Sequence, residues 1–202
     1  MHGLGLLACL VACGATPLAA QRGAWSGAFA AGYGTGAGDA FRGKGAVWAT
    51  AAGFRELSGA VRGGIELGYH RFNAIESRIP DAYGPGSLIS EDFRRSLWQA
   101  SATARFHASE GAWRLYFGSG LGAYLVHVHD HFTTQDPTSA PIPGLQFDET
   151  TAEVKPGAHL VAGIERAAAF GGAGLGVQAR WDGVLAGAFA NVLSVGLVLT
   201  LE

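Results

Sequence analysis

The sequence has little charge. Asp, Glu, Lys and Arg together make up 15% of its 202 residues, against roughly 25% in an ordinary soluble domain. The 14 Lys and Arg residues are offset by 16 Asp and Glu residues and form no basic block, so a nucleic-acid partner is not expected. Together with a mean hydropathy of +0.20, this shortage of charge argues against an ordinary cytosolic domain.

Cysteine is almost absent. Cys9 and Cys13 are the only two, and they lie in or just after a short apolar run at residues 4–11. An apolar run of this length followed by small residues is typical of a secretory signal peptide, and we expect cleavage after Ala20. The mature chain would then contain no cysteine, which excludes disulfides and cysteine-bound metal. In an alternative interpretation, residues 10–13 are a lipobox and Cys13 becomes the lipidated N-terminus.

Long apolar runs are absent as well. No run of 18 apolar residues follows the signal, so a transmembrane helix is not expected. Instead, uncharged segments of about 10 to 15 residues recur, and their side chains alternate with the period of a β-strand. This pattern predicts eight strands, at approximately 24–34, 45–55, 60–72, 94–107, 113–127, 152–166, 173–183 and 190–201.

The connections between these strands alternate in length. Short turns are predicted at 57–59, 109–111 and 167–172, and longer loops at 35–44, 73–93 and 128–151, with a shorter one at 184–189. This layout is typical of a transmembrane barrel whose short turns lie in the periplasm. We therefore predict an all-β fold: an eight-stranded antiparallel up-and-down transmembrane β-barrel at residues 21–202, behind a signal peptide at residues 1–20, in a bacterial outer membrane.

Each predicted strand has one apolar and one polar face. At 94–107, for example, Trp98 and Phe106 share a face with three alanines, and Gln99 and Arg105 lie on the other. A soluble sandwich would also alternate, but its outer face would carry more charge than this chain offers. We expect lipid outside and a paired polar network inside. The predicted interior set is Arg62, Glu66, Arg105, Arg114, Glu153, Lys155, Glu165, Gln178 and Arg180.

Aromatic, glycine and proline residues add to this interpretation. Aromatic rings near both ends of a strand predict interfacial girdles, with ordinary core aromatics as the alternative. Gly118, Gly120 and Gly122 are predicted to face inward and to leave room for long side chains from opposite strands. Pro156 cannot donate to a ladder, so we place it at the extracellular rim. The predicted girdle pairs are Trp25 and Tyr33, Trp48 and Phe54, and Trp98 and Phe106.

The last predicted strand carries a resemblance to a known family. Residues 194–201, Ser-Val-Gly-Leu-Val-Leu-Thr-Leu, resemble the C-terminal assembly signal of small outer-membrane barrels of the OmpA/OmpX type, although Leu201-Glu202 stands where the family usually has an aromatic residue. The resemblance implies insertion by the outer-membrane assembly machinery, with outer-membrane lipid as the other partner. It implies no activity, because this fold hosts adhesins, structural proteins, pores and enzymes.

No catalytic, cofactor-binding or metal-binding residue is assigned, and the protein is not expected to be an enzyme. His127, His129 and His131 share a face and could converge on a metal ion, with a solvated polar rim as the alternative. A lipid A-modifying enzyme would need a hydroxyl beside an oriented base. The alternative functions are this enzyme, a narrow pore or a metal-binding barrel. A wide pore is not expected, because side chains fill the interior of an eight-stranded barrel. The remaining function is structural or surface contact through the acidic loops 73–93 and 128–151.

Overall fold

The computed structural model describes residues 25–37, 45–80, 87–108, 111–135, 141–170, 172–186 and 188–202. The predicted signal peptide, its cleavage site and the alternative lipobox at Cys13 lie outside the described residues. Within the described ranges, no helix is long and apolar enough to cross a membrane.

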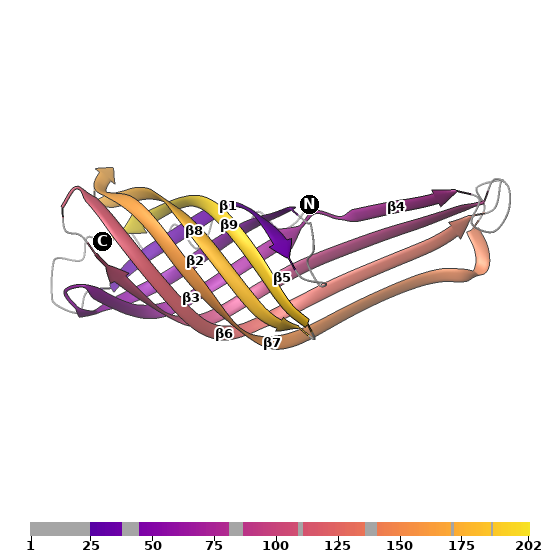
Figure 1. Cartoon of the computed structure of the whole chain (residues 1–202), viewed down its shortest axis with the longest axis horizontal. Coiled ribbons are helices and arrows are strands. Elements are labelled where there is room, and N and C mark those ends of the chain that lie inside the picture. Colours follow the sequence, from indigo (N-terminus) through magenta and orange to yellow (C-terminus); the bar gives the residue numbers. More distant parts are fainter. Residues whose placement is uncertain are drawn as a thin grey trace.

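Nine antiparallel strands make up the described chain. They pair in the order β3-β2-β1-β9-β8-β7-β6-β5-β4, and an additional pairing of β3 with β5 closes eight of them into a barrel (Figure 1). This closed barrel confirms the predicted antiparallel eight-stranded fold. The strands are β1 (Trp25–Ala37), β2 (Gly45–Ser58), β3 (Val61–Phe72), β4 (Ile75–Pro80), β5 (Leu88–His107), β6 (Trp113–Gln135), β7 (Pro141–Phe170), β8 (Ala173–Ala186) and β9 (Ala188–Leu201).

Much of the chain predicted to form loops 73–93 and 128–151 is strand. β4 and the adjoining parts of β5, β6 and β7 form a four-stranded extension (residues 75–80, 88–94, 129–135 and 141–150), here named the projecting sheet. Figure 1 shows it running well past the end of the barrel. The loop prediction was wrong because a strand outside a bilayer needs no uncharged lipid face, so charged residues are compatible with ladder pairing there.

The barrel is apolar outside and polar inside. On β5, Trp98 and Phe106 are 55% and 49% exposed, whereas Gln99 and Arg105 are 3% and 4% exposed. Water would favour the reverse, because it drives apolar surface inward and solvates charge. The predicted faces are therefore confirmed, and the soluble-sandwich alternative does not fit.

Two of the predicted girdle aromatics lie inside the barrel. Trp25, Tyr33, Trp98 and Phe106 are exposed on the outer wall as predicted, but Trp48 and Phe54 are buried. These two rings lie inside because the barrel interior has space for them. A Cβ atom at Gly196 would come within 2.7 Å of the Trp48 indole, and the Arg105 guanidinium stacks 4.4 Å from the centre of the Phe54 ring.

Two of the three inward glycines leave space for large side chains, as predicted, but for those on the neighbouring strand; the third, Gly122, pairs with the small Ser101. Gly118 pairs with Arg105, and a Cβ at Gly118 would come within 3.1 Å of the arginine side chain. Gly120 pairs with His159, whose ring a Cβ at Gly120 would overlap. The side chain that uses the space belongs to the paired residue on the adjacent strand, and not to a residue on the opposite wall of the barrel.

Pro156 lies where β7 leaves the barrel. The pairing of β7 with β8 ends at Gly157 and Val184. Pro156 is the next residue outward and pairs with Ala123 of β6. At Pro156, β7 no longer pairs with β8, so the ladder on that side requires no N–H donor from the proline. The predicted position at the rim is confirmed.

Candidate functional site

Arg180 is the centre of a buried ionic network inside the barrel. Its Nη1 donates to Glu66 Oε1 at 2.5 Å and its Nη2 to Gln99 Oε1 at 2.7 Å. Its Nε donates to Asp182 Oδ2 at 2.8 Å. Arg105 lies 3.6 Å from the second oxygen of Glu66. Two buried guanidinium groups therefore face two buried carboxylates, which is the pairing that makes such burial tolerable.

An apolar cluster fills the barrel between this network and the projecting sheet. Its members come from strand ends on that side, and they include Tyr124, whose hydroxyl donates to Asp182 at 3.3 Å. The ionic network and this cluster fill the interior as predicted for eight strands. The cluster consists of Ala46, Phe72, Leu97, Tyr124, Val126, Val184, Ala190 and Val192.

The predicted interior set is correct for residues in the middle of the barrel and wrong for residues nearer the projecting sheet. Glu66, Arg105, Glu165, Gln178 and Arg180 are buried. By contrast, the Glu153 and Lys155 side chains are 64% and 29% exposed and pair with each other at 2.7 Å. They point to the same side of β7 as the interior residues, but β7 has already passed the end of β8 there, so no opposite wall covers them.

The other two members of that set lie at the opposite mouth of the barrel. Arg62 and Arg114 both donate to Glu202 Oε1, the former at 3.0 Å. Burial raises the pKa of the Glu202 carboxyl, but the two hydrogen bonds and the two positive charges outweigh burial, so the pKa lies below its usual range. These three side chains form an ionic cluster at the short-turn end.

Two residues of the ionic network around Arg180 were not predicted from the sequence. Asp182 follows Arg180 by two positions and therefore continues its inward face, and His159 lies on the same face of β7 as Glu165. Both could have been found by extending the alternation through segments already predicted as strands. Both side chains are fully buried, with His159 Nε2 3.8 Å from Glu66.

The projecting sheet has two different faces. The face that continues the barrel interior carries aromatic and aliphatic side chains, with Phe132 paired with Phe147 and Ile75 paired with Phe93. The face that continues the outer wall carries polar residues, including Arg94 opposite His129. The projecting sheet therefore presents an apolar surface on one side and a polar surface on the other.

Two of the three candidate metal ligands, His129 and His131, lie on the polar face. His129 Nδ1 is 3.6 Å and His131 Nδ1 is 3.9 Å from the Asp148 carboxylate. His127 pairs with Ser96 and Ala152 and is not part of this group. In the part of the chain that the structure describes, no three His, Cys, Asp or Glu side chains are placed to hold a metal ion.

The same face holds hydroxyl, imidazole and carboxylate groups without forming a catalytic arrangement. Thr133 Oγ1 is 3.0 Å from His131 Nε2, but the 3.9 Å from His131 Nδ1 to Asp148 is too long for the hydrogen bond that orients a base. Another hydroxyl–imidazole spacing, His107-Ala108-Ser109, was overlooked in the sequence. It lies at the short-turn end, and Ser109 is outside the described residues.

The chain is similar to several solved structures but matches no protein family by sequence. No family model matches the chain, and no curated protein matches it significantly. Among solved structures, Neisserial surface protein A is 14% identical, covering 86% of this chain and 94% of its own, with a TM-score of 0.49. Ail, the attachment invasion locus protein of Yersinia pestis, in complex with the heparin analogue sucrose octasulfate, is 13% identical, with 88% and 99% coverage and a TM-score of 0.46.

The N-terminal β-barrel domain of Pseudomonas aeruginosa OprF is 15% identical, covering 87% of this chain and 97% of its own, with a TM-score of 0.43. The resemblance to small outer-membrane barrels predicted from the sequence agrees with this chain's own topology, a closed barrel of eight antiparallel strands. The closure of β3 on β5 and the inverted distribution of polar and apolar side chains describe that fold in this chain.

Proposed function

We propose that the protein is a surface protein of the bacterial outer membrane that holds the projecting sheet outside the cell as a contact surface. The exposed apolar wall supports a lipid environment for the barrel. Barrels of this kind keep their short turns in the periplasm, which directs the projecting sheet outward. From Gly157 to the start of β7, the chain runs roughly 50 Å at about 3.3 Å per residue.

The observation that carries this proposal is the apolar face of the projecting sheet. Phe147 and Ile79 are 45% and 50% exposed there, although a sheet standing in water has no lipid to cover it. Exposed aromatic and aliphatic groups gathered on one face mark contact surfaces. The apolar residues of this face are Ile75, Ile79, Ile89, Phe93, Phe132 and Phe147.

The charge on this face suggests the chemistry of the partner. Glu91, Asp130 and Glu149 lie among the apolar side chains, and Arg95 stacks at the base, 3.9 Å from the centre of the Phe93 ring. Apolar groups with carboxylates between them complement a surface that is apolar and basic. The sheet edges are less suitable for contact, because they contain Pro80 and Pro141, which offer no N–H to an added strand.

The placement of the sheet can be tested on intact cells. The predicted mature chain lacks cysteine, so Thr150→Cys in the projecting sheet and Gly59→Cys at the short-turn end each introduce a single thiol. We expect a membrane-impermeant maleimide to label Thr150→Cys on intact cells and Gly59→Cys only after lysis. The opposite pattern would place the sheet in the periplasm and end the proposal.

Contact can be tested with matched double variants. Phe132 and Phe147 pair across the ladder on the apolar face, and Thr133 and Gln146 pair on the other face. Random peptides selected on the detergent-folded protein should be rich in apolar and basic residues. We expect them to bind Phe132→Ala/Phe147→Ala at least about tenfold more weakly and Thr133→Ala/Gln146→Ala unchanged. No enrichment, or equal loss in both variants, would contradict the proposal.

A further inference from the structure

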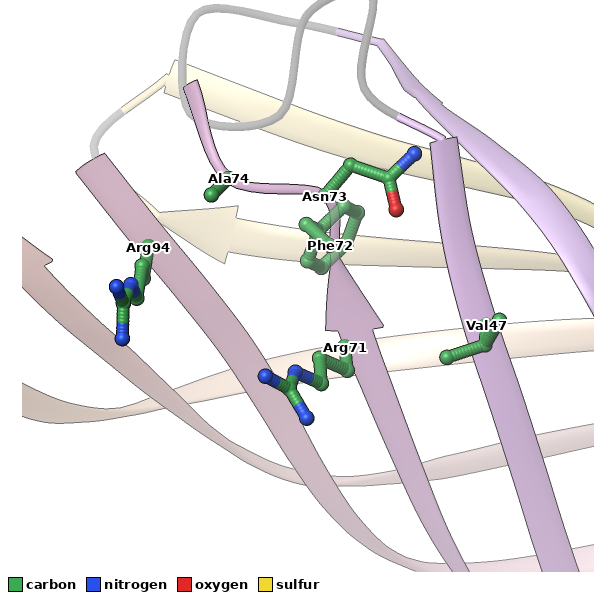
Figure 2. Close-up of a pocket in the computed structure, with 6 residues that line it drawn as sticks. All are labelled: Val47, Arg71, Phe72, Asn73, Ala74 and Arg94. Atoms are coloured by element: carbon green, nitrogen blue, oxygen red, sulfur yellow. The ribbon is translucent and has the colours of Figure 1, made fainter. Parts of the chain in front are cut away.

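We propose that a cleft on the outer wall at the base of the projecting sheet binds the phosphate group of an outer-leaflet lipid through Arg71 and Arg94. The cleft has a volume of about 470 Å³. It is lined by Val47 of β2, Arg71 and Phe72 of β3, Asn73 and Ala74 after β3, and Arg94 of β5 (Figure 2). The inference rests on the membrane placement proposed above and not on the contact role of the sheet.

The cleft lies directly above the apolar wall. On β3, the outward positions run from Leu67 through Tyr69 to Arg71. The ring of Tyr69 packs against that of Trp98 on β5, with centroids 4.4 Å apart. Such aromatic residues sit where acyl chains give way to headgroups. Arg71 is two residues further out and therefore lies at the depth of the headgroups.

An arginine at the other end of the apolar wall supports this placement of Arg71 at the headgroups. Arg55 is exposed on the outer face of β2 near the short turns, and it pairs with Gly63 of β3. The eight residues from Gly63 to Arg71 rise roughly 20 Å at about 3.3 Å each with a tilt near 40°. An outer-membrane barrel has an apolar band about 25 Å tall. The two arginine levels are thus separated by slightly less than the height of this band, and their long side chains can reach its two edges.

The two guanidinium groups are arranged for an anion. Arg94 is oriented by Asp92, which accepts from Nε at 3.2 Å and from Nη2 at 2.5 Å. Within the described residues, Arg71 forms no hydrogen bond or ion pair and is exposed, so its charge is uncompensated. Arg94 and Arg71 reach out from neighbouring strands (Figure 2). Guanidinium groups bind phosphate with paired, charge-assisted hydrogen bonds.

The neighbouring surfaces favour a lipid over a free phosphate ion. Val47 lines the cleft and is exposed, and Leu67 and Trp98 continue an apolar surface below it. An amphiphile can place its phosphate at the arginines and its acyl chains along this wall. His127 and His129 extend the same outward band on β6, where the Asp148 carboxylate lies 3.6 Å from His129.

Native mass spectrometry of the folded protein in neutral detergent can test this site. Titrated with lipid A carrying two phosphates, the wild type should bind about tenfold more tightly than with lipid A whose phosphates have been removed. Arg71→Gln/Arg94→Gln should lose this preference. The matched control Arg55→Gln, an exposed outward arginine at the other edge, should keep it. Urea midpoints of all variants, measured in the same detergent, should agree with that of the wild type.

Two results would overturn the assignment. Equal binding of both lipids by the wild type, or an equal loss in Arg55→Gln, would show that the cleft does not select the lipid phosphate. Displacement of the lipid by inorganic phosphate at equal concentration would show that the cleft binds free phosphate. Neither result depends on the peptide selection, so this inference and the contact proposal fail separately.

Discussion

The four buried charges around Arg180 lie beside opposite charges. Arg180 contacts both Glu66 and Asp182, and Arg105 lies on the other side of Glu66. Removing one member of such a set is costly, because its partner stays buried without compensation, whereas neutralising the whole set can be nearly neutral. The network therefore specifies how the eight strands face one another, and its net contribution to stability depends on being complete.

This leads to a prediction for Arg180. Arg180→Met should lower the free energy of unfolding by about 3–5 kcal/mol, because it removes the guanidinium beside Asp182 and leaves Glu66 with Arg105 alone. The double variant Arg180→Met/Asp182→Asn, which leaves Glu66 beside Arg105, should be less destabilised than Arg180→Met alone. Urea unfolding in detergent, followed by tryptophan fluorescence, measures both.

Arg62→Met is the control for this experiment. Arg62 pairs with Glu202 at the partly exposed mouth of the barrel, where losing an ion pair costs about 1 kcal/mol or less. If Arg180→Met were no more destabilised than Arg62→Met, the network would not be structurally important.

At the scale of single strands, alternation predicts which segments are strands and less reliably which residues face inward. It placed Trp98 and Phe106 outside correctly. The same reasoning placed Trp48 and Phe54 outside, because aromatic residues at strand ends suit a membrane interface equally well. The interior space for Trp48 comes in part from Gly196, far away in the sequence. A single strand read alone carries no information about such a partner.

Strand length was predicted only within the membrane. The criterion of an uncharged segment ends each strand at the bilayer edge, and so it missed β4 and the outer parts of β5, β6 and β7. The outward polar residues still recur at every second position, with Asp92 and Arg94 on β5 and His129 and His131 on β6. The period was therefore the better guide outside the bilayer, where charge and strand structure are compatible.

The ladder also predicts which glycines cannot be replaced. Gly163 pairs with Tyr116, and a Cβ at Gly163 would overlap the tyrosine ring. Tyr116 is fully buried and its hydroxyl donates to Gln178 at 2.8 Å, so the ring has little room to move. Gly163→Ala should lower the free energy of unfolding by about 1–3 kcal/mol, the usual cost of overpacking.

Gly53 provides the comparison, because it lies in β2 with only Trp25 near a Cβ, at 4.0 Å. Gly53→Ala should change the free energy of unfolding by about 0.5 kcal/mol or less. Urea titrations of the two variants under the same conditions give the difference. A Gly163→Ala barrel as stable as the Gly53→Ala barrel would mean that Tyr116 relocates without cost.

Over the whole molecule, layers of different chemistry follow one another inside the barrel, with buried aromatic residues such as Trp48 and Tyr116 among them. The apolar cluster that includes Leu97 and Tyr124 lies nearest the projecting sheet. The ionic network around Arg180 fills the middle, and Glu202 with its two arginines closes the short-turn end. Layers of different chemistry in series oppose permeation in different ways, because the first excludes ions by its low polarity and the second by packing and fixed charge.

The last prediction follows from this layering. In planar bilayers the wild-type protein should show no stable conductance steps, whereas a sixteen-stranded porin in the same bilayers should, because a barrel of that size leaves an aqueous channel. Leu97→Ala/Tyr124→Ala, which opens the apolar layer, should stay closed because the network below remains. Stable steps from the wild type would contradict the layered interior. Steps from the double variant alone would show that the apolar layer is the barrier and that the ionic layer passes water and ions through its hydrogen-bonded groups.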